Sequence, residues 1–257
     1  MPRKTPQLSV KDLFENGQQY YLPHISIDNV IFGFHDNELK VLLLQWNENG
    51  RWCLPGGFVL KDEDIQDAAA RVLKSRTSLS DIFLSQFHTF GSSKRKRRRH
   101  GIDKPKWLKA DSWFMDRFIT IGYWALVEFS KVIPKPDEFS MACQWCDIDK
   151  VPKLILDHND ILDHALVSLR RNLNEFPLGK DLLPTNFTMP ELQRLYETVL
   201  NKKLDRRNFQ KKILGLDILI KLQERKQGGA HKAPFLYKFD RTKYKKAMKS
   251  GLKSGLQ

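Results

Sequence analysis

The feature that most constrains the fold is the stretch of residues 54–79, in which a pair of glycines precedes a segment with helical periodicity. The apolar residues of that segment recur at the spacing of one helix face: Ile65, Ala68, Ala69, Val72 and Leu73. Gly56 and Gly57 permit a tight loop before the helix, because glycine adopts backbone conformations that other residues avoid. We therefore expect a helix that packs its apolar face on a sheet.

Segments of strand character surround this helix. Residues 24–33 and 39–45 are rich in β-forming and apolar side chains, and a hairpin turn is expected between them at Asp36-Asn37-Glu38. Residues 118–129 and 141–148 return to strand character, whereas residues 160–173 carry apolar side chains at helical spacing. This pattern predicts an α/β (α+β) domain, a sandwich of mixed sheet and helices.

The last third of the chain, after Pro177-Leu178-Gly179, has a different design. Thr188 is a candidate cap for a helix that begins with a proline in its first turn and carries an apolar stripe. Asp205 is a candidate cap for a second helix, and residues 219–223 and 234–239 then alternate as two strands. Helix, helix and β-hairpin is the pattern of a winged helix-turn-helix.

The net charge of +14 is concentrated in two segments. Residues 177–257 contain 19 Lys and Arg against 7 Asp and Glu, and residues 94–109 contain 9 against 1. The rest of the chain is therefore mildly acidic. This asymmetry is typical of a polyanion-binding appendage on a neutral-to-acidic domain, and the alternative is that the lysines only keep a surface solvated.

Length and composition exclude several classes of protein. A chain of 257 residues with 41% hydrophobic and 29% charged residues is globular rather than wholly disordered. Residues 118–127, the longest apolar-rich run without a charge, are about half as long as a bilayer-spanning helix. The first residues lack the apolar core of a signal peptide, and three cysteines do not form a disulfide framework. We expect a cytoplasmic protein that does not bind a membrane.

Residues 54–79 resemble the Nudix box, in which glycine, glutamate, arginine and apolar residues recur at fixed intervals. The positions that match at the correct spacing are Gly57, Glu63, Arg71, Leu73 and Leu79. The Leu-Pro-Gly-Gly sequence at the start of the stretch and the alanines before Arg71 are also similar to the family. The resemblance implies a Nudix-like fold for the first domain.

The departures from the box fall on its metal-binding positions. The family's helix glutamates are Val72, Ser75 and Arg76 here, and its final glycine is Ser78. Nudix hydrolases use those carboxylates to hold divalent cations, whereas the cation of Arg76 repels Mg²⁺. The resemblance therefore implies no catalytic residue, no metal and no cofactor, and a fold that survives as a ligand-binding cleft or, alternatively, as an inert scaffold. The candidate effector-binding residues are Trp46, Gly56, Gly57 and Arg71.

The C-terminal sequence resembles the Nudix-related transcriptional regulators of bacteria, which join a Nudix-like effector domain to a winged helix-turn-helix. The resemblance covers residues 23–239, and its most specific pieces lie at residues 183–188, 191–197 and 205–209. It implies the following organisation: an N-terminal segment (1–20), a Nudix-like effector-binding domain (21–155), a linker helix and connection (156–180), a winged helix-turn-helix domain (181–245) and a basic tail (246–257).

The second helix of the winged-helix pattern is the candidate recognition helix. Arg and Lys suit guanine or phosphate, and Asn and Gln suit adenine, while Phe209, Ile213 and Leu214 can face the core. The candidate DNA contacts on this helix and in the wing loop are Arg206, Arg207, Asn208, Gln210, Lys211, Lys212, Lys226, His231 and Lys232. A homodimer would present two such helices to an inverted repeat in double-stranded DNA. Whether the protein represses or activates transcription stays open.

Family members respond to small-molecule effectors such as ADP-ribose or sugars, and the sequence favours a sugar, sugar derivative or sugar phosphate over ADP-ribose. A cleft without metal-binding carboxylates has lost one means of neutralising a diphosphate, whereas a neutral sugar needs only polar groups and an aromatic face. The counter-argument is that Arg71, Arg76 and the basic run at residues 94–99 hold phosphates directly. The insert at residues 94–109 is expected to be solvated, with effector or DNA contact as alternatives.

Weaker patterns are assigned structural roles. Cys143 and Cys146 form a lone C-x-x-C whose thiols would point to opposite faces of a strand, so zinc or redox chemistry is not expected. Asp157-His158 and Asp163-His164 are assigned capping and surface roles, because the two histidines do not share a helical face.

Two alternative functions remain open. A Nudix hydrolase of nucleoside diphosphate derivatives would need non-standard metal ligands in place of Val72, Ser75 and Arg76. A basic RNA-binding or scaffold protein would bind with strong salt dependence and without sequence preference. We therefore expect a DNA-binding transcriptional regulator with a small-molecule effector, with the hydrolase as the first alternative.

Overall fold

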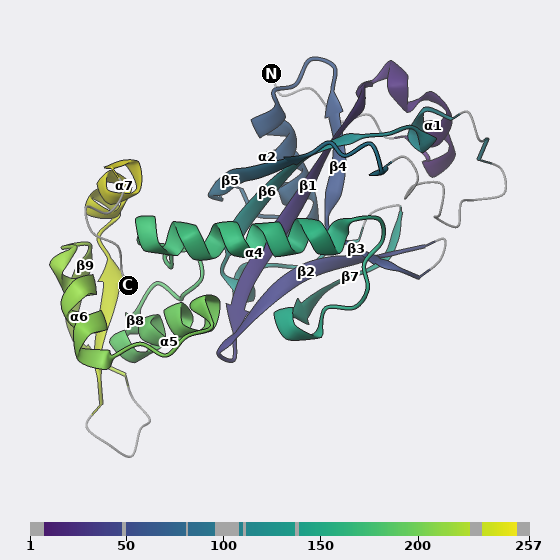
Figure 1. The fold of residues 1–257 in the computed structure, drawn as a ribbon. Coiled ribbons are helices and arrows are strands. Elements are labelled where there is room, and N and C mark those ends of the chain that lie inside the picture. The colour runs from purple at the N-terminus through teal and green to yellow at the C-terminus, as the bar shows by residue number, and fades with distance from the viewer. Residues whose placement is uncertain are drawn as a thin grey trace. The chain divides into compact units, whose positions relative to one another are not determined.

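The computed structural model describes residues 8–47, 50–80, 82–95, 108–109, 112–136, 139–226 and 233–250. These residues form two compact units, and Figure 1 shows the chain as a ribbon. The first unit contains the described residues within 1–32, 40–125 and 131–165, and the second contains those within 33–39, 126–130 and 166–257. No helix in the described part of the chain is long and apolar enough to cross a membrane.

A seven-stranded sheet is the framework of the first unit. Its strands follow the order β3-β2-β1-β6-β5, with β4 also paired to β1 and β7 also paired to β2. Their bounds are β1 (Tyr21–His35), β2 (Glu38–Trp46), β3 (Trp52–Cys53), β4 (Gly56–Leu60), β5 (Leu84–Phe90), β6 (Ile119–Val127) and β7 (Ser140–Asp147). The structure confirms the strands predicted at residues 24–33, 39–45, 118–129 and 141–148, which are β1, β2, β6 and β7. Strands β3, β4 and β5 are additions to the predicted set.

A two-residue turn joins β1 to β2, where the sequence predicts a hairpin. Asp36 and Asn37 both have positive φ, 50° and 64° respectively. Positive φ at both central residues is the signature of a type I′ turn, whose twist matches that of the flanking strands. Because Asp and Asn enter this region more readily than most residues, the two side chains specify the turn locally.

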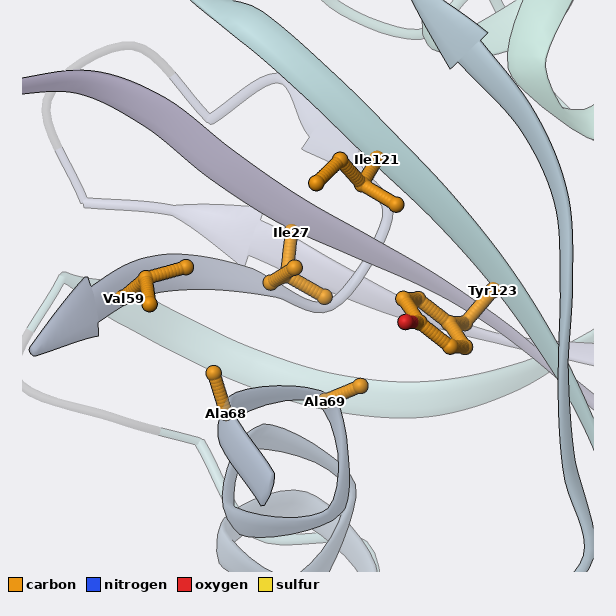
Figure 2. Packing of buried hydrophobic residues seen from close by; sticks show 6 residues of the cluster. All are labelled: Ile27, Val59, Ala68, Ala69, Ile121 and Tyr123. Carbon is orange, nitrogen blue, oxygen red and sulfur yellow. The ribbon is translucent and has the colours of Figure 1, made fainter. Parts of the chain in front are cut away.

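Helix α2 (Ile65–Thr77) packs against β4 and buries the predicted apolar face. Figure 2 shows the cluster that joins this face to β1, β4 and β6: Ile27, Val59, Ala68, Ala69, Ile121 and Tyr123. The small side chains of the two alanines allow the helix backbone to lie close to the sheet. Ile65, which is predicted to share this face, is 39% exposed because it is the first residue of the helix.

The glycine pair before α2 lies in a strand, so the predicted tight loop is wrong. Gly56 and Gly57 begin β4 and pair with Asp28 and Ile27 of β1, and neither glycine has a positive φ. A Cβ atom on Gly56 would lie 2.4 Å from Asp28 Oδ1, and one on Gly57 would lie 2.6 Å from Val72 Cγ2. Close packing, and not backbone freedom, is therefore what requires glycine at these positions.

Two helices extend the first unit at either end of its sequence. Helix α4 (His158–Glu175) confirms the helix predicted at residues 160–173 and begins in this unit, where Ile161 and Ala165 are fully buried. Helix α1 (Val10–Asn16) is not predicted by the sequence analysis. Its Leu13 and Phe14 are buried, so the N-terminal segment contributes to the core.

The second unit has the predicted order of helix, helix and hairpin (Figure 1). Helices α5 (Met189–Leu200) and α6 (Arg206–Gly215) precede strands β9 (Leu219–Arg225) and β10 (Phe235–Phe239), and β8 (Phe187–Thr188) also pairs with β10. Both predicted caps are confirmed, because Thr188 accepts a hydrogen bond from Glu191 N and Asp205 accepts one from Asn208 N. These caps satisfy backbone donors that a helix start otherwise leaves unpaired.

Polar side chains fix the turn between α5 and α6. Glu197 Oε1 accepts hydrogen bonds from Gln193 Nε2 at 3.1 Å and from Leu204 N at 2.9 Å. Tyr196 of α5 and Phe209 of α6 pack edge to face with ring centroids 5.4 Å apart. The second helix of the pair is therefore held firmly against the first.

Helix α7 (Arg241–Ser250) includes the start of the stretch predicted to be a basic tail. Asp240 Oδ1 accepts hydrogen bonds from the backbone N atoms of Thr242 and Lys243, which caps the helix. Tyr244 is buried against Phe239 with ring centroids 5.1 Å apart. The Lys243 ammonium also donates to Asp217 Oδ2 at 2.6 Å. Residues 246–250, predicted to begin a basic tail, are therefore the last part of a helix whose first turn is anchored.

Candidate functional site

A cavity of about 760 Å³ lies in the first unit. Its walls come from α1, α2 and strands β1, β2, β3, β4, β6 and β7, together with connecting segments and the residues that lead into α4. The four residues predicted to bind an effector all line it: Trp46, Gly56, Gly57 and Arg71. The volume is in the range of pockets that bind small molecules and cofactors.

Aromatic rings form much of the apolar wall. Phe14 of α1 lies edge to face with Phe114 and Phe139, with ring centroids 4.2 and 5.8 Å apart. Tyr21 and Phe58 lie 5.7 Å apart on neighbouring strands. All five rings line the cavity, and such rings supply faces on which a planar base or a sugar ring can pack.

Arg71 and Glu63 form a bidentate ion pair at one side of the cavity. Arg71 Nε donates to Glu63 Oε1 and Arg71 Nη2 donates to Glu63 Oε2, both at 2.7 Å. Arg71 Nη2 also donates to the Phe58 carbonyl at 2.7 Å, and Leu60 N donates to Glu63 Oε2 at 3.1 Å. Partial burial raises the pKa of Glu63, but the hydrogen bonds from Arg71 and Leu60 outweigh burial and hold it below its ordinary value.

The positions at which the resemblance expects metal-binding carboxylates are Val72, Ser75 and Arg76, and all three line the cavity. Val72 packs against Gly57, and Ser75 Oγ donates to the Val72 carbonyl at 2.7 Å. Glu63, the acidic residue that matches the Nudix box, forms an ion pair with Arg71. No group of three or more His, Cys, Asp or Glu side chains suited to a metal ion occurs among the described residues. At Val72, Ser75 and Arg76 the chain therefore offers no carboxylate to a divalent cation.

A buried polar network forms another side of the cavity. Arg95 Nη1 donates to Asp157 Oδ2 at 2.6 Å, and Arg95 Nη2 donates to Thr120 Oγ1 at 2.6 Å. The Thr120 hydroxyl in turn lies 2.6 Å from the Ser26 hydroxyl, within hydrogen-bond distance. Arg95 is only 6% exposed, so for this residue the expectation of a solvated basic insert is wrong. Residues 96–107 of that insert lie outside the described residues.

The approach to α4 completes this side of the cavity. Asp157 and His158 are each 6% exposed, and His158 Nδ1 accepts a hydrogen bond from Leu54 N at 2.9 Å. The surface role assigned to this pair is therefore wrong. Leu156 has a φ of 51°, a left-handed conformation that costs a non-glycine residue energy and that recurs at binding sites.

No sequence pattern identifies some of the residues that line the cavity. Thr120 and Ser26 lie in strands of ordinary composition, and Phe14 belongs to the N-terminal segment (1–20), to which the sequence assigns no role. Arg95 and Asp157 do belong to patterns that the sequence analysis notes, but 62 positions separate them. The folded sheet is what brings these side chains together.

The weaker sequence patterns lie apart from this site or at its edge. Cys143 and Cys146 lie in β7, and burial and the Asp147 carboxylate raise the pKa of the Cys146 thiol. A raised pKa disfavours the reactive thiolate. His164 lies on the exposed side of α4, with its ring centroid 4.8 Å from that of His88.

Helix α6 carries a surface of basic and amide side chains. Arg206, Arg207, Asn208, Lys211 and Lys212 are exposed on it, and Gln210 is half-buried. Phe209 and Ile213 are buried as predicted, but Leu214 is 42% exposed, so the prediction that it faces the core is wrong. A helix whose apolar side is anchored and whose basic side is free of the core can enter a DNA groove.

The wing residues are described only in part. The Lys226 ammonium donates to Glu191 Oε1 of the α5 capping box, which holds the base of the wing. Arg225 Nη1 donates to the Ala233 carbonyl at 2.7 Å across the same hairpin. His231 and Lys232, the other predicted wing contacts, lie outside the described residues.

Both parts of the chain match known protein families. Residues 22–165 match the family model of the NUDIX domain, and residues 179–239 match that of the NrtR DNA-binding winged helix domain. The chain is 28% identical over 227 residues to the ADPR responsive transcriptional repressor NtrR of Acinetobacter baylyi, an alignment that covers 86% of this chain and 83% of the relative. It is 26% identical over 149 residues to the ADP-ribose pyrophosphatase of Methanocaldococcus jannaschii, covering 56% and 73%.

The fold is also that of a solved structure. The crystal structure of Shewanella oneidensis NrtR complexed with a 27mer DNA matches with a TM-score of 0.70 at 24% identity. The match covers 91% of this chain and 99% of that chain. Both units therefore have counterparts in a single known architecture.

Proposed function

Because the chain belongs to the Nudix family and joins its Nudix domain to an NrtR DNA-binding winged helix domain, we propose that it is a transcriptional repressor controlled by a small-molecule effector. The observation that carries this proposal is the pairing within one chain of a ligand-sized cavity with an anchored, cationic helix α6. The repressor role rests on the Acinetobacter baylyi relative, which is named as a repressor.

ADP-ribose is the effector that we propose. The Acinetobacter baylyi relative is responsive to ADP-ribose, and the cavity offers aromatic faces together with basic side chains. The sequence-based preference for a sugar weighed the loss of metal-binding carboxylates above the basic side chains that could hold phosphates. The cavity lining includes Arg71, Arg76 and Lys135, which favours the second argument, and no comparison supports the sugar.

DNA recognition is assigned to α6 and the wing. The exposed side chains Arg206, Arg207 and Asn208 lie at the N-terminal end of α6, where a recognition helix contacts base edges. Lys211 and Lys212 follow on the same helix and suit phosphates. We propose that two copies of the chain bind an inverted repeat, with one α6 in each half-site.

Hydrolysis is not part of the proposal. The relative from Methanocaldococcus jannaschii is an ADP-ribose pyrophosphatase, but this chain has Val72, Ser75 and Arg76 where the resemblance expects metal-binding carboxylates. Incubation of the full chain with ADP-ribose and Mg²⁺ or Mn²⁺, followed by chromatography, should show no release of AMP. Turnover that Glu63→Gln abolishes would favour the hydrolase instead.

The test of the whole proposal is a DNA-binding titration with and without effector. Fluorescence anisotropy with DNA upstream of the chain's own operon should give a specific complex whose affinity falls as salt rises. Addition of ADP-ribose should release that DNA. Binding without sequence preference at every salt concentration would instead indicate a general nucleic-acid-binding protein.

A further inference from the structure

Asp28 places a buried carboxylate in the wall of the cavity. It lies in the interior of β1, the middle strand of the sheet order, and it is 6% exposed. Aspartate is disfavoured inside strands, and burying a carboxylate is costly unless other groups donate hydrogen bonds to it. An acidic side chain at this position therefore needs a physical reason.

The Asp28 carboxylate has no partner in the described part of the chain, where no group donates a hydrogen bond to it or forms an ion pair with it. Its neighbour in β1 is different, because Asn29 Nδ2 donates to the Ala69 carbonyl of α2 at 3.0 Å. Two cations of the cavity, Arg71 and Arg95, form ion pairs with other carboxylates. The donors that the Asp28 carboxylate needs must therefore come from whatever occupies the cavity.

The neighbouring strand leaves room for this carboxylate. Gly56 of β4 pairs with Asp28 of β1, and a Cβ atom on Gly56 would lie 2.4 Å from Asp28 Oδ1. Any other residue at position 56 would have to displace the carboxylate or the strand. The glycine and the aspartate therefore act together to place an acidic group at the cavity wall.

Hydroxyl groups lie on the same wall. Ser26 precedes Asp28 by two residues in β1, so the two side chains point to one face of the strand, and both line the cavity. Ile27 lies between them and packs instead with the buried alanines of α2 (Figure 2). The Ser26 hydroxyl lies 2.6 Å from the hydroxyl of Thr120, which also lines the cavity. This wall suits a ligand that is rich in O–H donors.

The chemistry of a carboxylate narrows the choice of ligand group. A carboxylate accepts hydrogen bonds and donates none, and its two oxygens can accept from the neighbouring hydroxyls of a ribose ring. The same negative charge repels phosphate oxygens. The Asp28 wall therefore suits the sugar of a phosphorylated ligand and not its phosphates.

We infer that Asp28 accepts hydrogen bonds from the vicinal hydroxyls of a ribose in the ligand, and that it thereby selects ribosyl compounds over deoxyribosyl compounds. This inference rests on the proposed function, because it concerns the effector of the same cavity. It adds a specificity residue that the sequence analysis does not single out.

Calorimetric titration of the full chain with ADP-ribose tests the inference. Asp28→Asn keeps the shape of the side chain but replaces one acceptor oxygen with a donor. It should weaken ADP-ribose binding about 10- to 100-fold, the loss expected for hydrogen bonds to a charged group. Asp67→Asn is the matched control, because it removes the same charge from an exposed position of α2 outside the cavity. The control should bind ADP-ribose as the wild type does.

Deoxy analogues identify the ligand group that Asp28 contacts. Of the two ADP-ribose analogues that lack the 2-hydroxyl of one or the other ribose, one should bind the wild type more weakly than ADP-ribose. Asp28→Asn should bind that analogue and ADP-ribose with similar affinity, because the contact is already lost. A wild type that binds both analogues as tightly as ADP-ribose would overturn the inference.

Thermal unfolding separates a binding role from a structural one. Because the Asp28 carboxylate makes no hydrogen bond or ion pair with the described residues, Asp28→Asn should leave the melting temperature unchanged or raise it. Asn29→Ala, which removes the hydrogen bond to α2, should lower it. A lower melting temperature for Asp28→Asn, or an unchanged affinity for ADP-ribose, would overturn the inference. Binding that requires a divalent cation and is lost in Asp28→Asn would make Asp28 a metal ligand and would also overturn it.

Pentose phosphates separate the inference from the effector assignment. If ADP-ribose does not bind the wild type, the proposed effector is wrong. Ribose 5-phosphate that raises the melting temperature of the wild type but not of Asp28→Asn, while 2-deoxyribose 5-phosphate raises neither, would still support the role of Asp28. Absence of a shift by ribose 5-phosphate in that case would reject it.

Discussion

Helices α2 and α6 both carry arginines, and the two helices use them in opposite ways. On α2, Arg71 donates to the Glu63 carboxylate and to the Phe58 carbonyl, and its side chain is 25% exposed. On α6, Arg206 and Arg207 are exposed. A guanidinium that is fixed by a carboxylate shapes a binding site, whereas an exposed one is available to a polyanion outside the molecule.

The two helices also differ at their ends. The N-cap Asp205 of α6 accepts a hydrogen bond from Asn208 N, whereas the N-cap Asp64 of α2 accepts none from the helix. Helix α2 ends in a left-handed residue, Ser78, while α6 ends in Leu216 with right-handed helical φ and ψ. Helix α2 has no side-chain cap and is held by its packing on the sheet, whereas α6 has both a cap and packing against α5. Mutations at fixed and at exposed cations should therefore give different phenotypes.

The largest effect is expected from removing a carboxylate that fixes a cation. Asp157→Ala leaves the guanidinium of Arg95 buried without its acid partner, since both side chains are only 7% exposed. Breaking a buried ion pair on one side costs about 3–5 kcal/mol of unfolding free energy. Urea denaturation measures this loss. Asp149→Ala is the control, because Asp149 is exposed. If Asp157→Ala lowers the free energy of unfolding no more than the control does, the Arg95–Asp157 pair does not stabilise the fold.

The opposite phenotype is expected on α6. Arg207→Ala should weaken specific DNA binding by about 1–3 kcal/mol while the free energy of unfolding stays unchanged, because an exposed head group is lost without core volume. Anisotropy titrations measure the first quantity and urea denaturation the second. Arg117→Ala, an exposed arginine of the first unit, should change neither. If Arg207→Ala destabilises the fold and leaves the DNA affinity intact, the contrast between the two helices fails.

The contrast also explains which parts of the molecule the sequence predicts. The apolar period of α2, the type I′ turn at Asp36 and Asn37 and the caps Thr188 and Asp205 are local signals, and the structure contains all of them. The exposed side of α6 follows from the same local periodicity. The fixed cations do not, because the partner of a buried guanidinium can lie anywhere along the chain.

The cavity shows the limit most clearly. Gly56 and Gly57 are singled out by the sequence, but their role in close packing depends on Asp28 and Val72, which only the folded sheet places beside them. Arg95 belongs to a run of basic residues, and this composition alone predicts that the run is solvated. Its burial depends on the distant Asp157. Sequence patterns therefore identify the helix of the binding site better than they identify its walls.

The ion pair of Arg71 and Glu63 should make the free energy of unfolding depend on pH, whereas the exposed arginines of α6 should not. The pKa of Glu63 lies below its ordinary value of 4.5 in the folded chain, because hydrogen bonds from Arg71 and Leu60 outweigh the effect of burial. A depressed folded-state pKa stabilises the protein above the unfolded value and loses that stabilisation as the pH falls through the folded value. Glu63→Gln should therefore lower the free energy of unfolding by about 1–2 kcal/mol at neutral pH.

The difference between wild type and Glu63→Gln should shrink as the pH is lowered below about 4.5. Urea denaturation over a pH series measures it. Arg207→Ala should show no such dependence, since its side chain is exposed. A difference that stays constant down to pH values at which the carboxylate is protonated would show that the pair contributes through packing and not through charge.

The smallest effect is expected at the end of α2. Ser78 has a φ of 60° at the position where the Nudix box has glycine, and its N–H donates to the Lys74 carbonyl. Glycine relieves the left-handed strain but enlarges the entropy of the unfolded chain, so Ser78→Gly should stabilise the protein by less than about 1 kcal/mol. Asn201, at a φ of 50° at the end of α5, is the matched control, because asparagine tolerates this conformation better than serine. Asn201→Gly should therefore gain less than Ser78→Gly in thermal or urea unfolding, and an equal gain at both ends would mean that side-chain strain does not distinguish them.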